Sequence, residues 1–226
     1  NNYVSYANLL WRVVAINPDQ SVRLILESTT YPTTQYNTDD KLESAVGYTY
    51  VDGEKLADSK IKIALQEWYT NNLKNLGFNK NLVAQNFCND TSSTLSGKNV
   101  IYGPQTRLYS NPSPTLNCPE TNNEYGGKYN EYVGLLTADE VAIAGGVAKK
   151  ANLSYYLVTN TSYFLLSPSD YYKGQAYVMV VNTKGEINDT LVNNTLALRP
   201  VINLKASVTV SGSGLQTDPY VIDLDT

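Results

Sequence analysis

Apolar and polar residues alternate near the start of the chain in the pattern typical of β-strands. Two such runs, Leu9–Ile16 and Val22–Glu27, flank the tetrapeptide Asn17-Pro18-Asp19-Gln20. Proline presets the backbone of a turn, and asparagine and aspartate favour turn positions. The pattern therefore predicts a β-hairpin, with Trp11 on the same strand face as Val13 and Ala15.

Helical spacing of apolar residues appears in residues 61–76. The segment has Asp58 or Ser59 available as its N-cap and Gly77 as its stop. We expect an amphipathic helix that packs on a sheet. Its Trp68 and Tyr69 suggest a platform for sugar, but at this spacing packing in the core is the favoured interpretation.

A second, shorter helix is predicted after residue 137. Thr137 and Glu140 have the spacing of a capping box, and Gly145-Gly146 ends the segment. The adjacent acids Asp139 and Glu140 are interpreted as solvated helix-cap residues, because the spacing of acids along a sequence cannot show two carboxyls facing each other in a cleft.

The last third of the chain again has the pattern of strands separated by turn residues. Because strands and helices do not alternate regularly, the order favours a single α+β domain over residues 1–226, with antiparallel or mixed twisted sheets, two helices and long irregular loops. The expected strands are residues 154–158, 162–167, 176–182, 195–204, 207–210 and 219–224.

The middle of the chain, residues 79–132, is polar and rich in glycine, proline and asparagine, which predicts a long loop that needs a tie. Cys88 and Cys118 are the chain's two cysteines. A bridge between them would close a loop of about 30 residues, worth roughly 3 to 4 kcal/mol. We predict this disulfide and therefore an oxidising, extracellular location. The alternatives are two free thiols and, with less support, a metal site.

Composition excludes several classes of function. The 226 residues carry a net charge of −4 without a basic cluster, which argues against binding of nucleic acid. No apolar run approaches the roughly 18 residues needed to cross a bilayer. The chain has no histidine, so the usual imidazole base and metal ligand are both missing. We predict a chain that is not an enzyme and uses no cofactor or metal, with a structural calcium left open.

Several motifs in order carry a resemblance to a known family. They are "NNYVSYANLLWRVVAIN", "EWYTNNL", "FCND", "NCP", "VGLLTADEVAIAGG", "LLSPSD", "LRPVINL" and "GSGLQTDPYVI". Over essentially its whole length the chain resembles a bacterial extracellular domain family of unknown function, frequent in Firmicutes, with a C-type-lectin-like fold. That fold is distantly similar to the formylglycine-generating enzymes, but this chain lacks their late pair of reactive cysteines. It also lacks the tripeptides with which C-type lectins bind calcium and sugar.

The resemblance implies roles for Arg199 and Pro200, which interrupt the apolar run Leu196–Lys205. In such folds an arginine of this strand is held by carbonyls and a carboxylate beneath the ligand-facing loops, and the proline marks an edge or bulge. We therefore expect Arg199 to be buried with a full set of acceptors. Trp11 and Trp68 are expected to be structural as well. The resemblance also implies that a strand normally precedes residue 1.

In lectin-like folds the long loops before the last strands face the ligand. Here these correspond to residues 167–177 and 182–194, whose aromatic and polar side chains suit an adaptable interface. We expect a binding or adhesion module for a glycan or a protein on a surface. The alternative is a structural subunit that assembles with its own copies into a fibre or layer by strand completion. The predicted ligand-binding residues are Asp170, Tyr171, Tyr172, Lys173, Tyr177, Asn188, Asp189 and Asn193.

Overall fold

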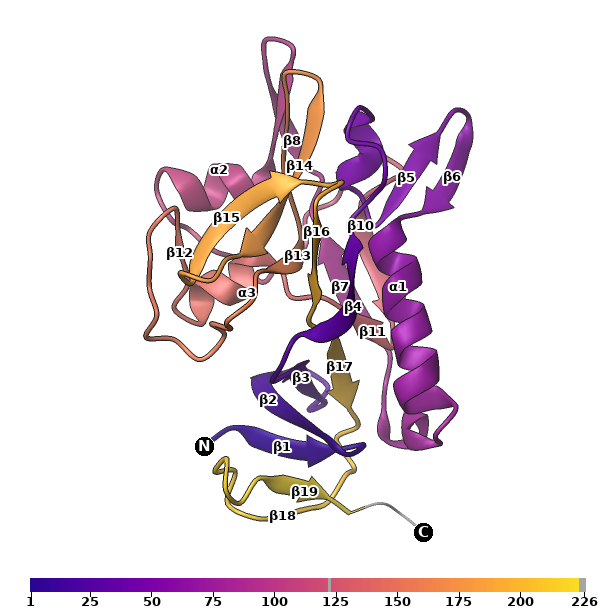
Figure 1. Cartoon of the computed structure of the whole chain (residues 1–226), viewed down its shortest axis with the longest axis vertical. Helices are drawn as coiled ribbons and strands as arrows, with labels where there is room; N and C mark the ends of the chain where they lie inside the picture. The colour runs from indigo at the N-terminus through magenta and orange to yellow at the C-terminus, as the bar shows by residue number, and fades with distance from the viewer. Residues whose placement is uncertain (122, 224–226) are drawn as a thin grey trace.

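The computed structural model describes residues 1–121 and 123–223, and within them the chain folds as an α+β structure of mixed sheets and three α-helices (Figure 1). Buried side chains from the two large sheets form one hydrophobic cluster. The class agrees with the sequence prediction. The helix count differs, because a third helix lies inside the segment that was expected to be a loop.

The lower part of Figure 1 contains a seven-stranded sheet in the order β11-β17-β3-β2-β1-β19-β18. The predicted hairpin is confirmed as β2 and β3, which pair antiparallel with a register shift between Val13 and Ala15. Strand β1 is paired on both sides, with β2 and in parallel with β19. The strands are β1 (Tyr3–Tyr6), β2 (Leu9–Ile16), β3 (Val22–Leu26), β11 (Val133–Gly134), β17 (Val201–Leu204), β18 (Val210–Ser211) and β19 (Tyr220–Ile222).

The upper part contains an eight-stranded sheet in which β12-β15-β14-β13-β16-β4 form the main path and the β8–β9 hairpin joins β13. Two small ribbons, β5–β6 and β7–β10, lie beside it. The strands of the large sheet are β4 (Thr30–Gln35), β8 (Ser93–Ser96), β9 (Asn99–Tyr102), β12 (Val147–Ala148), β13 (Tyr163–Tyr172), β14 (Gln175–Val181), β15 (Glu186–Leu191) and β16 (Thr195–Leu198). Those of the ribbons are β5 (Thr49–Asp52), β6 (Lys55–Asp58), β7 (Gln85–Asn89) and β10 (Gly127–Glu131).

Both predicted helices are present with their predicted caps. Helix α1 (Lys60–Tyr69) begins at Ser59, whose side chain accepts a hydrogen bond from the Lys62 N–H. It continues through a π-helical turn, Thr70–Lys74, towards Gly77, whose positive φ of 82° reverses the chain. Helix α3 (Ala138–Ile143) has the complete capping box. The 3-10 turns Glu43–Val46 and Phe78–Asn81 complete the helical elements.

The middle segment is more ordered than its composition predicts. Residues 79–132 contain strands β7 to β10 and helix α2 (Gly103–Tyr109), so the prediction of a long irregular loop is wrong there. The predicted disulfide is confirmed: Cys88 and Cys118 are bonded, with their Cα atoms 5.6 Å apart. The bridge ties the chain after α2 to the β7 strand.

Three further strand predictions need correction. Residues 154–158 form a bend and a turn and not a strand. Their contacts are individual ones: the buried Tyr155 donates its hydroxyl to the Gly185 carbonyl, and the Leu157 carbonyl accepts from the Tyr163 hydroxyl. Residues 207–210 contribute only the start of β18, and 219–224 only β19, with Leu224 outside the described residues. The supposed ligand-facing loops at 167–177 and 182–194 are largely β13, β14 and β15.

Arg199 and Pro200 divide what the sequence predicted as one strand. The run 195–204 is β16 in the upper sheet and β17 in the lower sheet, and the two residues form the crossing between them. The Pro200 carbonyl accepts a hydrogen bond from the Leu26 N–H. Arg199 is 1% exposed and bonds the backbone carbonyls of Leu26, Glu27 and Leu157. The predicted carbonyl acceptors are thus confirmed, and the expected carboxylate is that of Glu27, 3.9 Å from the guanidinium, so the residue joins the two sheets.

The two tryptophans pack against each other, as their structural assignment predicts. Their ring centroids are 6.1 Å apart with an edge-to-face angle of 73°. Trp11 is fully buried and donates its indole N–H to the Tyr6 carbonyl. Tyr69 is buried and stacks on Tyr132. Trp68 is only half-buried, so one side of this side chain is exposed at the surface.

Candidate functional site

The eight predicted ligand-binding residues do not form one surface. Asp170, Asn188 and Asp189 lie in a cluster under α2, and Tyr171, Tyr172 and Lys173 lie at the tip of the β13–β14 hairpin. The half-buried Tyr177 stands between Asp170 and Leu191 in the sheet register. Asn193 lies apart, where its carbonyl accepts a hydrogen bond from the Gln35 side chain.

The cluster under α2 is held together by its own hydrogen bonds. Asp189 Oδ2 accepts from the Tyr109 hydroxyl at 2.6 Å and from Lys149 Nζ at 2.7 Å. Lys149 Nζ also reaches Asn188 Oδ1, at 2.6 Å, and lies 4.7 Å above the Tyr109 ring. These contacts join β15 to α2 and to the residue that follows β12, so the cluster stabilises the fold.

The acidity of Asp170 is altered by its surroundings. Its carboxylate accepts a hydrogen bond from Gln105 Nε2 at 3.0 Å. Burial raises the pKa of the Asp170 carboxyl above its ordinary value, and the nearby Asp189 charge adds to the shift, against the opposing hydrogen bond from Gln105.

The hairpin tip projects from the top of the molecule beside the tip of the β8–β9 hairpin (Figure 1). Strands β9 and β13 pair, and the Lys173 N–H donates to Asn99 Oδ1 at 2.9 Å, so each hairpin supports the other. Lys173 and Gly174 both have positive φ, as a tight two-residue turn requires. The exposed apolar side chains here are Tyr172 and Leu95, the latter 80% exposed. We call these two tips the paired hairpins.

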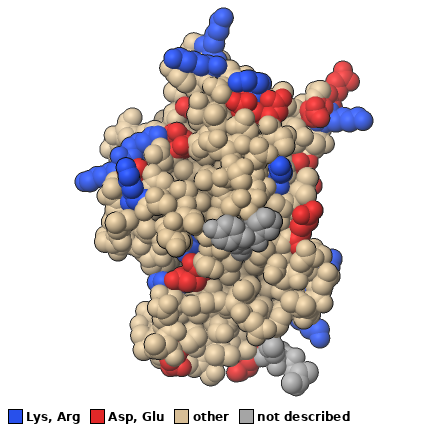
Figure 2. Space-filling view, viewed as in Figure 1, with Lys and Arg blue, Asp and Glu red and all other residues tan. Residues whose placement is uncertain are grey.

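Charged side chains also gather at this end of the molecule. Figure 2 shows lysine and arginine side chains at the top and on one side, acidic side chains just below the top and at an upper corner, and a broad middle of the same face with few charges. Lys173 Nζ lies 5.1 Å from the centre of the Tyr172 ring. Below, the Tyr171 hydroxyl donates to the Lys41 carbonyl at 2.8 Å. The paired hairpins therefore present cationic and apolar groups on a supported base.

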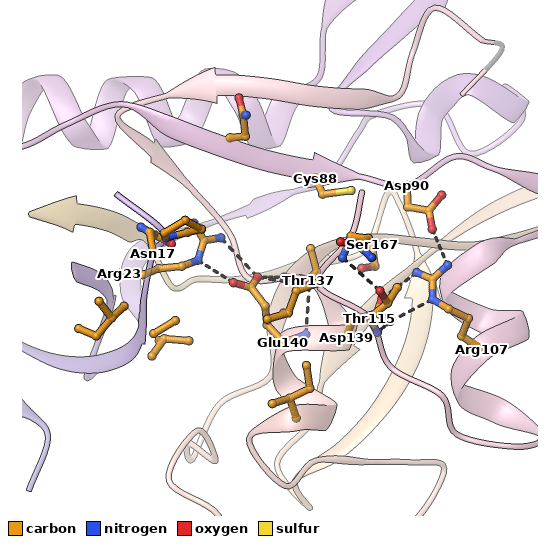
Figure 3. A pocket seen from close by; sticks show the side chains of 18 residues that line it. Asn17, Arg23, Cys88, Asp90, Arg107, Thr115, Thr137, Asp139, Glu140 and Ser167 are labelled. Carbon is orange, nitrogen blue, oxygen red and sulfur yellow. Dashed lines mark hydrogen bonds and ion pairs between the residues drawn. The ribbon is translucent and has the colours of Figure 1, made fainter. Parts of the chain in front are cut away.

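A cavity of about 390 Å³ lies between the β2–β3 turn, β7, the disulfide loop and α3 (Figure 3). Figure 3 shows two ion-pair groups in its wall, one on each side. The rim carries the exposed aliphatic side chains of Ile16, Leu116 and Ile143. The cavity is of the size that small ligands occupy in proteins, about 300–1,000 Å³.

Arg107 forms the first ion-pair group. Its guanidinium contacts Asp90 Oδ2 at 2.7 Å and both carboxylate oxygens of Asp139, at 3.0 and 2.8 Å. The Thr115 N–H adds a bond to Asp139 Oδ1. Burial lowers the pKa of Arg107, but the hydrogen bonds to Asp139 and Asp90 raise it by more, so Arg107 stays charged. The group fixes α2, β7 and the disulfide loop against α3.

Arg23 and Glu140 form the second group. Arg23 Nε lies 2.6 Å from Glu140 Oε1, and the guanidinium lies 4.5 Å above the Phe87 ring. Glu140 also closes the capping box by accepting the Thr137 N–H. Asp139 and Glu140 are each paired with an arginine, so the interpretation that these acids are solvated is wrong for both, whereas the helix-cap role of Glu140 is confirmed.

Sequence reasoning did not select Arg23 and Arg107 as partners of these acids. The acids themselves were visible as an adjacent pair, but their partners lie 117 and 32 residues away along the chain. A buried acid needs a cationic partner. Because the sequence contains few arginines, each of them was a candidate for that partner.

No protein-family model, curated protein or solved structure was found to match this chain. Among the described residues, no group of three or more histidine, cysteine, aspartate or glutamate side chains is arranged to hold a metal ion. No helix in residues 1–121 and 123–223 is long and apolar enough to cross a membrane.

Proposed function

We propose that the chain is a non-catalytic extracellular module of C-type-lectin-like fold that binds a glycan or a protein on a surface through the paired hairpins. The observation that carries this proposal is the exposure of Leu95, Tyr172 and Lys173 on two hairpins that support each other. Exposed aromatic side chains such as Tyr172 are enriched at contact surfaces. Partner groups that fit them are apolar and anionic.

The cavity supports the non-catalytic part of the proposal. A general acid or base must be within reach of its substrate and able to exchange a proton. In the cavity wall, Asp90, Asp139 and Glu140 each accept hydrogen bonds from an arginine and from at least one further donor. Carboxylates engaged in this way stabilise the fold, and a substrate would have to break those contacts first. The disulfide fits an oxidising, extracellular setting.

The alternative function, assembly of copies by strand completion, has less support. Strand β1, at the start of the chain, is already paired on both sides, with β2 and with β19 of the same chain. Assembly would have to use another edge, such as that of β18. Size-exclusion chromatography of the purified chain tests this directly, since a concentration-independent monomer excludes assembly.

The proposal is tested by binding of the purified chain to an array of glycans and cell-surface proteins. Leu95→Ala and Tyr172→Ala remove exposed side chains from the paired hairpins. Leu56→Ala is the matched control, because Leu56 is an exposed leucine on another hairpin, β5–β6. We expect the two hairpin variants to lose about tenfold or more in affinity while the control keeps it. A ligand that binds all four proteins equally well contradicts the assignment.

A further inference from the structure

A second hollow, a groove of about 530 Å³, lies between helix α1 and the outer strand β4 of the upper sheet. Figure 1 shows α1 running beside β4. The wall of the groove contains Trp68. The sequence suggested this side chain as a platform for sugar, although packing in the core was the favoured interpretation. The structure supports both descriptions, because Trp68 is half-buried against Trp11 and also lines the groove.

Trp68 is held in place from two directions. Its ring meets the edge of the buried Trp11 ring, and its backbone carbonyl accepts a hydrogen bond from Asn72 Nδ2 at 2.8 Å. Its indole N–H makes no hydrogen bond to the described part of the chain. A fixed aromatic surface loses little conformational entropy when a ligand stacks on it.

The polar side chains around Trp68 are uncommitted, in contrast with those of the cavity. Glu67 on α1, Asn71 in the π-helical turn that follows it and Thr33 on β4 are exposed and make no side-chain hydrogen bond or ion pair within residues 1–121 and 123–223. Lys60 bonds only Gln35 Oε1, at 2.9 Å. The groove thus offers a carboxylate, an amide and a hydroxyl near one aromatic surface.

We propose that this groove binds a neutral oligosaccharide, with one pyranose ring stacked on Trp68 and its hydroxyls bonded to Glu67, Asn71 and Thr33. A pyranose presents an apolar C–H surface on one side and hydroxyl groups at its rim. Those hydroxyls need partners to replace the water they lose on binding, and the free acceptors and donors of the groove supply them. One acid and one base line the groove, so it carries no excess charge to select an anionic sugar.

The inference rests on the proposed function in one respect, that the chain is a binding module, and it adds a separate site with a stated ligand class. An extended peptide lying beside β4 is the competing occupant. The chemistry favours the sugar, because a single aromatic wall with uncommitted polar groups at its rim suits stacked rings, whereas peptide binding at a strand edge depends mainly on backbone hydrogen bonds.

The experiment uses the full chain with neutral oligosaccharides of glucose, mannose and N-acetylglucosamine, sialylated oligosaccharides and unstructured peptides. Trp68→Phe, Glu67→Gln and Asn71→Ala alter the groove, and Asn75→Ala, at an exposed position just past the helix, is the control. We expect a neutral oligosaccharide to bind the wild type and the control alike. Each groove variant is expected to weaken binding about tenfold.

Tryptophan fluorescence provides a readout that a structural role would not move. The chain has two tryptophans, and Trp11 is fully buried, so a ligand or a soluble quencher reaches Trp68 first. We expect the sugar to protect the emission from quenching by acrylamide. Glu67→Gln and Asn71→Ala keep the same unliganded emission and lose the protection, which separates loss of the site from loss of the fold.

Three outcomes overturn the inference. The first is that no neutral oligosaccharide binds, and the second is that one binds the groove variants as well as the wild type. The third is that peptides, and not sugars, bind and are lost in the groove variants. If binding is lost only in Leu95→Ala and Tyr172→Ala, the groove is wrong and the function proposed for the paired hairpins stands.

Discussion

Replacing Arg199 with methionine tests the central structural role that the sequence assigned to this residue. The guanidinium is buried and donates to the carbonyls of Leu26, at 2.8 Å, and Glu27, at 3.2 Å, and also to that of Leu157. It further contacts the Tyr163 hydroxyl at 3.2 Å. Methionine fills much of the same space but leaves these acceptors without their donor.

The size of the effect follows from the acceptors that are left behind. An unsatisfied buried polar group costs about 1–3 kcal/mol, and such losses within one network are not additive. Several neutral acceptors lose the same donor at once, so we expect Arg199→Met to cost about 2–4 kcal/mol, which is a large share of the roughly 5–15 kcal/mol by which a domain is stable. The two sheets also lose their shared anchor.

Urea denaturation at neutral pH, followed by tryptophan fluorescence, measures the loss. The midpoint should fall markedly in Arg199→Met. Lys98→Met, which removes a positive charge from the exposed turn between β8 and β9, is the control and should stay within about 0.5 kcal/mol of the wild type. A loss below about 1 kcal/mol for Arg199→Met would refute the view that this guanidinium anchors the crossing.

Three further predictions concern other parts of the fold. Replacing Cys88 and Cys118 with serine should lower the free energy of unfolding by roughly 3 to 4 kcal/mol, the value for a loop of 30 residues, and added reductant should then have no further effect. Tyr36→Phe removes a buried hydroxyl without a partner among the described residues and should leave stability unchanged or raise it. Tyr163→Phe breaks the hydrogen bonds to Leu157 and Arg199 and should lower stability by about 1–2 kcal/mol. Equal effects of the two variants in urea denaturation would contradict both expectations. Because burial raises the pKa of Asp170, the native state holds the carboxyl proton more tightly than the unfolded chain does. The stability that Asp170 contributes therefore falls as the pH rises from about 3.9 through the raised pKa. Asp170→Asn should flatten that part of a plot of unfolding free energy against pH, and an unchanged plot would count against this assignment.

The elements that the sequence predicted correctly are those specified by neighbouring residues. The β2–β3 hairpin follows from alternation around a proline turn, and α3 follows from its capping box. The disulfide could be predicted because the chain has two cysteines, which allow a single pairing. Each of these signals lies within a short stretch or has few alternatives.

The elements that it missed depend on contacts between distant segments. Strand β13 contains Ser167, Pro168 and Ser169, which read as a loop, yet both serines are buried. Ser167 Oγ accepts the Ala138 N–H at the start of α3, a partner 29 residues away. Helix α2 begins with Gly103 and Pro104, a pair that reads as a turn, although proline is also favoured in the first turn of a helix.

The candidate sites could be predicted only in part, because they also depend on contacts between distant segments. Tyrosine-rich composition pointed to the β13–β14 hairpin, but it could not show that Asp170 and Asp189 turn towards α2 while Tyr172 turns outward. Face and partner depend on the register of four strands, β9, β13, β14 and β15. A one-residue change in that register would exchange the buried and exposed sets.

The cavity and the groove differ in what their polar groups already do. In the cavity, the guanidinium of Arg107 and the carboxylate of Asp139 satisfy each other, and separating them would leave buried charges without partners. In the groove beside α1, the side chains of Glu67 and Asn71 are exposed and have no partner among the described residues, so a ligand does not have to break protein contacts to reach them. A ligand gains most where the protein has not already satisfied its own polar groups. On that ground the half-buried Trp68, and not the more heavily charged cavity, is where we expect a small ligand to bind.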